Sequence, residues 1–82
     1  MPRYFFYIAD GDRFPDEEGA ILPDVTAAIQ MASAGAREIV AEDLKQGKGL
    51  SLNDRIEIHD ETGQIVGIVT FREAVGLEGQ PE

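Results

Sequence analysis

Apolar side chains fill nearly every position of residues 3–9, which predicts a β-strand with two apolar faces. Side chains alternate along a strand, so Tyr4, Phe6 and Ile8 would lie on one face, and Phe5, Tyr7 and Ala9 on the other. A strand with one solvated face would instead alternate apolar and polar residues. The second face of this strand therefore needs cover from a loop, a partner protein or another copy of the chain.

Apolar residues recur at helical spacing between residues 24 and 46, which predicts one long helix. Asp24 suits the N-cap position, and Gly47 suits the position just after the helix. The apolar positions are Val25, Ala28, Ile29, Ala32, Ala36, Ile39 and Val40, with Gly35 beside them at a cost of about 1 kcal/mol relative to alanine. Because the centre of this stripe is small, we expect it to pack closely against the aromatic residues of strand 3–9.

Two later runs predict a β-hairpin. Residues 55–59 alternate polar and apolar, and residues 64–71 are apolar on both faces. The residues between them, Asp60-Glu61-Thr62-Gly63, are typical of a hairpin turn. In strand 55–59 we expect Ile56 and Ile58 to point inward, and Glu57 and His59 outward.

Together these elements predict an α+β fold of two layers, with helix 24–46 covering one face of a small, mainly antiparallel sheet. Apolar residues on both faces are typical of central strands, so the predicted strand order is 55–59, 64–71, 3–9 and a short edge strand at 20–22. The helix would then connect strand 3–9 to a parallel strand 55–59. In this prediction residues 1–75 form a single domain and residues 76–82 a frayed tail.

Asp43 interrupts the apolar stripe of the helix, because it follows Val25 by five helical turns and shares its face. A carboxylate at such a position must be hydrogen-bonded or lie at the rim, since burying it unpaired is costly. One interpretation is that Asp43 caps the 47–52 connection or pairs with an arginine of the sheet. The arginines available for this pairing are Arg3, Arg55 and Arg72. The other interpretation is a buried polar site, a functional carboxylate in a small pocket.

The chain has 82 residues, no cysteine and a net charge of −9. This charge argues against binding to a nucleic-acid backbone or to an anionic membrane surface. The absence of cysteine rules out a disulfide framework and is compatible with a cytoplasmic location. We expect no signal peptide, since Asp10 ends the first apolar run, and no apolar segment approaches the roughly 20 residues that span a bilayer.

The negative charge is concentrated in residues 10–24, which contain six acidic residues and the single basic residue Arg13. Asp10-Gly11 begins an expected loop over residues 10–19. The acidic segment is either a solvated loop that keeps the protein soluble or a docking patch for a basic partner protein.

No residue set indicates a catalytic, cofactor-binding or metal site. Asp10, Asp12 and Asp16 resemble the start of a calcium loop, but its fifth, sixth and twelfth positions would be Phe14, Pro15 and Ile21, which do not fit. The single histidine, His59, cannot form a multi-histidine metal site within one chain, and no nucleophile pairs with it in the sequence.

The order of several short motifs resembles a family of small uncharacterised proteins, a domain of unknown function, from soil and plant-associated bacteria. The motifs are Arg3-Tyr4-Phe5-Phe6, Asp10-Gly11, Asp16-Glu17-Glu18-Gly19, Leu22-Pro23-Asp24, Ala41-Glu42-Asp43-Leu44, Ile56-Glu57-Ile58 with Asp60-Glu61-x-Gly63, and Phe71-Arg72-Glu73-Ala74-Val75. The resemblance covers about residues 2–75 and implies a single domain. It implies no activity, cofactor or site.

Three hypotheses about function follow. The first is a non-enzymatic protein-interaction module, homodimeric through the second apolar face of the sheet, with Tyr4, Phe5, Phe6 and Tyr7 as candidate contacts. The second is an acidic adaptor that binds a basic protein through residues 10–24, in particular through Asp16, Glu17 and Glu18. The third is a small-ligand binder or enzyme centred on Asp43.

Overall fold

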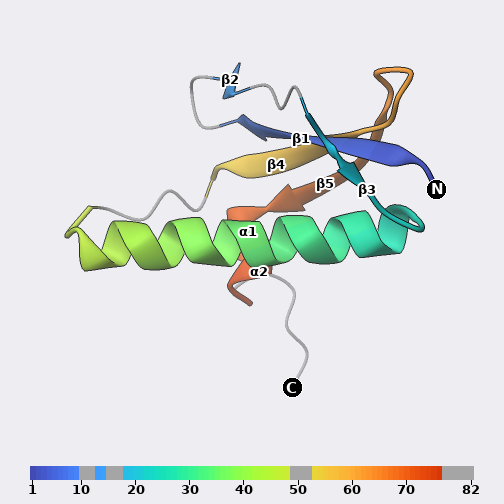
Figure 1. Cartoon of the computed structure of the whole chain (residues 1–82). Coiled ribbons are helices and arrows are strands. Elements are labelled where there is room, and N and C mark those ends of the chain that lie inside the picture. Colours follow the sequence, from blue (N-terminus) through green and yellow to red (C-terminus); the bar gives the residue numbers. More distant parts are fainter. Residues whose placement is uncertain (10–12, 15–17, 49–52, 77–82) are drawn as a thin grey trace.

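The computed structural model describes residues 1–9, 13–14, 18–48 and 53–76. Its elements are β1 (Arg3–Ala9), β2 (Arg13–Phe14), β3 (Ala20–Ile21), α1 (Val25–Lys45), β4 (Arg55–His59), β5 (Ile65–Thr70) and α2 (Phe71–Ala74). An antiparallel sheet forms one layer and α1 the other, so the predicted two-layer α+β fold is confirmed (Figure 1). Apart from Gly76, the predicted tail lies outside the described residues.

The strands follow the order β2-β1-β4-β5, and β3 pairs with the N-terminal end of β1. β4 pairs with β1 on one side and with β5 on the other. The predicted order, which placed strand 64–71 between strands 55–59 and 3–9, is therefore wrong. Apolar residues on both faces misled the prediction, because β5 is an edge strand whose Ile65 and Ile68 are exposed.

The predicted parallel direction of strands 3–9 and 55–59 is also wrong, and the short strands β2 and β3 explain why. Both run antiparallel to β1 and return the chain to its N-terminal end, where the Leu22 N–H donates to the Pro2 carbonyl at 3.1 Å. From there α1 runs back along the sheet, so β4 starts near the end of β1 and runs in the opposite direction (Figure 1). The expected loop over residues 10–19 contains β2, and this additional crossing reverses the direction of β4.

α1 begins and ends where its sequence predicts. The Asp24 side chain accepts a hydrogen bond from the Ala27 N–H at 2.9 Å, Gln46 is the C-cap, and Gly47 follows. Its buried side chains are Ala28, Ala32, Ala36 and Val40, and they belong to one core with the larger Tyr4, Ile56, Ile58, Val69 and Phe71. The small helix stripe does pack against large side chains, but these come mainly from β4, β5 and α2, so the expected packing against the aromatic residues of strand 3–9 is wrong apart from Tyr4.

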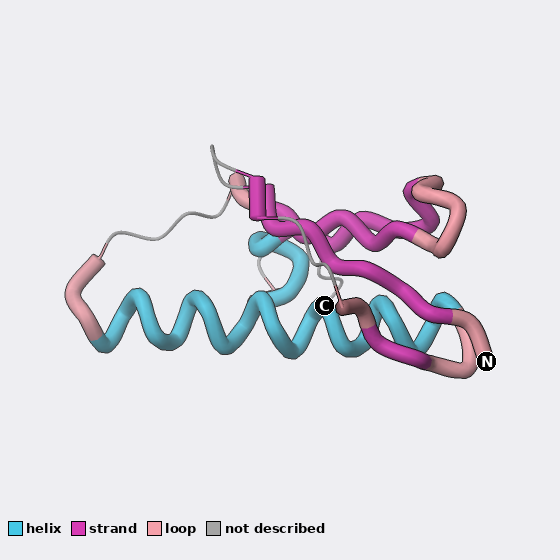
Figure 2. Tube along the Cα trace, turned by 45° about the horizontal axis from the view of Figure 1, so that its top comes forward, coloured by secondary structure: helices cyan, strands magenta, loops and turns pink. Residues whose placement is uncertain are grey.

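α2 completes the core beyond the end of β5. The Thr70 hydroxyl accepts from the Glu73 N–H at 3.0 Å, and the Glu73 carboxylate accepts from the Thr70 N–H at 3.1 Å, which forms a capping box. The Arg37 guanidinium donates to the Ala74 carbonyl at 3.2 Å and connects α1 to α2. α1 consequently packs mainly against β4, β5 and α2, and its C-terminal turns extend past the sheet (Figure 2).

Asp60 organises the turn between β4 and β5. Its carboxylate accepts hydrogen bonds from the Thr62 hydroxyl at 2.6 Å, the Thr62 N–H at 2.9 Å and the Gln64 N–H at 3.0 Å. These bonds, and first of all that from the Thr62 hydroxyl, lower the pKa of the Asp60 carboxyl from its usual 3.8. The turn is therefore strongest when Asp60 is ionised.

Two glycines of the fold differ in what surrounds them. Gly19 has φ +71°, and a Cβ there would lie 2.7 Å from the Tyr4 carbonyl oxygen, so a side chain would be strained and would collide with β1. Gly35 lies within α1, and a Cβ there would have no atom within 4 Å. Of these two glycines, only Gly19 is required by its surroundings.

We expect Gly35→Ala to raise the free energy of unfolding by about 0.5–1 kcal/mol, because alanine is the better helix former and meets no obstacle. Gly19→Ala should lower it by about 1–3 kcal/mol through backbone strain. Urea denaturation measures both changes. Equal effects of the two substitutions would contradict the packing described for α1 and β3.

We also expect the Asp60 carboxylate to make stability depend on pH at the acid end. Folding lowers the pKa of Asp60 below its usual value of 3.8. The stabilisation that the ionised carboxylate gives to the folded state is therefore present above this usual value, and it is lost as the pH falls through the pKa of the folded state. The difference in unfolding free energy between wild type and Asp60→Asn should be constant above about pH 5 and should shift against wild type below it. Urea denaturation over a pH series tests this, and a difference that does not vary with pH contradicts it.

Candidate functional site

The aromatic residues of β1 point to opposite sides of the sheet. Tyr4 and Phe6 face α1; Tyr4 is buried in the core, and Phe6 is half-buried at its margin. Phe5 and Tyr7 lie on the other face, opposite His59 and Glu57 of β4. The four candidate contact residues therefore belong to two different surfaces, and Tyr4 is a core residue.

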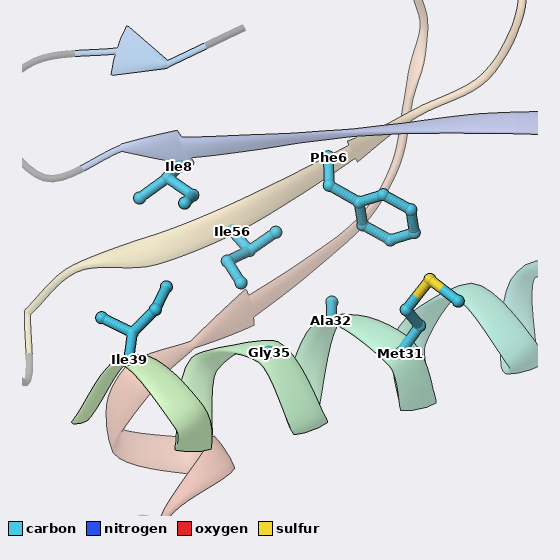
Figure 3. Close-up of a pocket in the computed structure, with 7 residues that line it drawn as sticks. All are labelled: Phe6, Ile8, Met31, Ala32, Gly35, Ile39 and Ile56. Carbon is cyan, nitrogen blue, oxygen red and sulfur yellow. The ribbon is translucent and has the colours of Figure 1, made fainter. Parts of the chain in front are cut away.

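An apolar pocket opens between α1 and β1, and we call it the α1–β1 groove (Figure 3). It has a volume of about 220 Å³. The residues that line it are Phe6, Ile8, Met31, Ala32, Gly35, Ile39 and Ile56. The groove exists because α1 packs towards β4, β5 and α2, which leaves the space beneath β1 only partly filled. Met31 at its edge is 46% exposed.

Two carboxylates lie on the helix beside this groove. Glu38 and Glu42 are exposed, and at 3.6 residues per turn they continue the helix stripe of Met31 and Gly35. The Glu42 carboxylate accepts a hydrogen bond from the Gln46 side-chain amide at 2.9 Å. The rim of the apolar groove is thus acidic on its α1 side.

The face of the sheet away from α1 contains a buried carboxylate, Glu57, which is only 2% exposed. One of its oxygens accepts from the Arg55 guanidinium at 3.1 and 3.3 Å, and the other lies 3.3 Å from His59 Nε2. The Tyr7 ring stacks on the His59 ring, with centroids 4.2 Å apart. The expectation that Glu57 points away from α1 is correct in direction, but the side chain is buried and paired.

This polar cluster changes the interpretation of the second sheet face. Phe5 and Tyr7 lie there as expected, but Arg55, Glu57 and His59 place charged and polar groups in its middle. A carboxylate bonded to an imidazole can fix the orientation of the ring. The α1–β1 groove lies on the opposite face, so the pair and the groove do not combine into one site.

Asp43 is half-buried rather than buried, and within the described part of the chain the buried charged residue is Glu57. The Asp43 backbone carbonyl accepts from the Lys48 N–H at 2.9 Å, and no hydrogen bond to its carboxylate is found from the described residues. Of the three arginines considered for it, Arg55 pairs with Glu57 and Arg3 donates to the Glu18 carbonyl. The signal for the Glu57 cluster was present in the sequence, since a basic residue and a histidine flank Glu57 at alternate positions of one strand.

Of the candidate acidic residues, Asp16 and Glu17 lie outside the described residues, as do Asp10 and Asp12 of the rejected calcium loop. Glu18 is exposed, and its backbone carbonyl accepts from the Arg3 guanidinium at 2.8 Å. Within residues 1–9, 13–14, 18–48 and 53–76, no three metal-ligating side chains gather closely enough to hold an ion. None of the described helices is long and apolar enough to cross a membrane.

The fold and its surfaces define a small α+β domain with an apolar groove on one side of its sheet and, on the other, a buried carboxylate paired with an exposed arginine and a histidine. The chain belongs to the family DUF6894, described as a domain of unknown function, whose model matches residues 3–72. No curated protein matches the chain, and no solved structure does. The matched segment includes both the groove and the Glu57 cluster.

We expect Glu57→Ala to lower the free energy of unfolding by about 1–3 kcal/mol, because it leaves Arg55 and His59 without their buried acceptor. Asp43→Ala should change it by less than about 0.5 kcal/mol, since alanine is the better helix former and an acidic residue near a helix C-terminus is unfavourable. Chemical denaturation of both variants compares the two carboxylates. A larger loss for Asp43→Ala would contradict this assignment.

Proposed function

We propose that this protein is a non-enzymatic protein-interaction module that binds a basic, amphipathic segment of a partner protein in the α1–β1 groove. The observation that carries the proposal is Gly35 in the groove wall. Glycine costs about 1 kcal/mol inside a helix. Gly35 has no positive φ, and no atom lies within 4 Å of the position of a Cβ, so neither the backbone nor the packing requires glycine there. Glycine leaves the groove at its widest there, and a long side chain at this position would fill it.

The size and lining of the groove support a side chain as its occupant. Small-molecule and cofactor sites usually measure about 300–1,000 Å³ and contain a few placed polar groups. This groove measures about 220 Å³, and its lining residues are all apolar. One or two large apolar side chains fit this volume and chemistry better than a substrate, so we favour an interaction role over a ligand site or an active site.

The acidic rim supports a basic partner. Glu38 and Glu42 lie beside the groove, and the chain as a whole carries a net charge of −9. Lysine or arginine residues next to the apolar anchor would gain from this field, and acidic segments would be repelled. Binding should therefore weaken as the salt concentration rises.

Two other modes are alternatives to this proposal. A basic partner that docks on residues 10–24 would depend on Asp16, Glu17 and Glu18 rather than on the groove rim. A homodimer through the sheet face away from α1 has less support, because Arg55 and Glu57 place charge in the middle of that face. The setting that we propose is the cytoplasm of a soil or plant-associated bacterium, in agreement with the absence of cysteine.

A peptide library displayed on phage, selected against the immobilised protein, tests the proposal. We expect the selected peptides to share a large apolar residue flanked by lysine or arginine. A synthetic copy should then bind wild type, and Gly35→Met should weaken it about tenfold or more by filling the groove. Fluorescence anisotropy measures both affinities.

The matched control is Gly35→Ala, which gains the same helix propensity but leaves most of the groove empty, so it should retain binding. Glu38→Lys with Glu42→Lys should weaken binding, whereas Glu18→Lys should not. Peptides without an apolar anchor, or equal binding to Gly35→Met and Gly35→Ala, would contradict the groove as the docking site. Sensitivity to Glu18→Lys alone would favour the acidic segment instead.

A further inference from the structure

We propose that two copies of this chain associate through the edges of their β5 strands, which pair antiparallel about a two-fold axis and form one continuous sheet. This dimer uses a different surface from the α1–β1 groove and does not depend on it.

Among the described residues, none pairs with the outer edge of β5 at its centre. The Phe71 N–H donates to the Asp54 carbonyl at 2.9 Å, which fixes the alternation of the β4–β5 ladder. By this alternation the Ile68 N–H and carbonyl point away from β4, and β5 is the end strand of the order β2-β1-β4-β5. The next outward N–H, that of Thr70, is already bonded to the Glu73 carboxylate at 3.1 Å. The open part of the edge is therefore centred on Ile68.

The side chains of β5 lack the usual protection of an edge strand. Exposed edges normally carry lysine, proline or inward-pointing charge, which prevent pairing with other strands. The segment 65–70, Ile-Val-Gly-Ile-Val-Thr, contains no charged residue and no proline. Ile65 and Ile68 are 46% and 50% exposed on the sheet face away from α1. Pairing of β5 would remove part of this apolar surface from water.

A second copy fits this edge better than another partner for two reasons. An antiparallel pair of identical edges is self-complementary, because each Ile68 N–H meets the Ile68 carbonyl of the other copy across the two-fold axis. Two chains that each carry a net charge of −9 repel one another over much of their surface, whereas segment 65–70 carries no carboxylate of its own and Glu73 lies only at its end, on the Thr70 N–H.

The same register brings charged residues together at both ends of the paired strands. With Ile68 opposite Ile68, the start of α2 in one copy lies beside the β4–β5 turn of the other. Arg72 and its neighbour Glu73 at the start of α2 then both approach a turn that carries Asp60 and Glu61. Attraction and repulsion thus occur together at each end of the symmetric dimer, so the register rests on the backbone pairing at Ile68.

Sedimentation equilibrium of the full chain at about 10–500 µM tests the proposal, since pairing along one short edge buries little area and should be weak. We expect the average mass of wild type to rise from that of a monomer towards twice that value. Ile68→Lys should weaken association about tenfold or more. This substitution makes the chain less negative, so weaker association could not be attributed to greater repulsion between the copies.

The matched control is Leu44→Lys, which makes the same charge change at an apolar residue of α1 that is 58% exposed, and it should leave the dimer intact. Gly35→Met, which fills the α1–β1 groove, should also leave the dimer intact. The proposal of a β5 dimer and the proposal of partner binding in the groove are therefore tested separately. Circular dichroism confirms that each variant is folded. A wild type that stays monomeric throughout the range, or a dimer that survives Ile68→Lys or is lost with Gly35→Met, overturns the proposal.

Discussion

The packing of α1 against the sheet is the interaction on which the other features of this molecule depend. A single helix has to cover a sheet that is wider than itself, and α1 meets this constraint by packing towards β4, β5 and α2. Its alanines allow this close approach, and the Arg37 contact to Ala74 connects it to α2. The parts of the sheet that α1 does not cover are either occupied by other side chains or left open to solvent.

The two regions that α1 does not cover, beneath β1 and on the far face of the sheet, differ in what occupies them. Beneath β1 the space stays open as the α1–β1 groove, and Gly35 adds no side chain to close it. On the far face of the sheet, Glu57 is buried between Arg55 and His59, and Tyr7 stacks over the histidine. An ion pair between a buried carboxylate and an exposed arginine often contributes little net stability, but removing the buried acceptor is costly to the groups that it bonds. The cluster therefore occupies this face of the sheet with paired polar groups and adds little to the free energy of unfolding.

Local patterns in the sequence predicted the elements well, because the forces behind them act between near neighbours. The N-cap at Asp24, the helical spacing to Val40 and the turn at Asp60 all follow from residues within one or two helical turns. The strand order was not predictable in this way. It depends on β2 and β3, two short strands with little sequence signal that return the chain to the start of β1. It also depends on β5, an edge strand that is as apolar as a central one. Glu57 was predicted to point away from the core, and it does. Its burial was not predicted, because alternation along a strand gives the face on which a side chain lies but not what covers that face.

The central claim is that α1 leaves the groove beneath β1 open while it closes the core beneath β4 and β5. Solvent paramagnetic relaxation of methyl signals, measured by NMR with a soluble gadolinium chelate, tests this directly. The account predicts strong relaxation of the Met31 methyl group, comparable to the exposed Leu44, and weak relaxation of Ile58 and Ala36 in the core. Protection of Met31 equal to that of Ile58 would mean that the groove is filled in solution, and it would contradict the account.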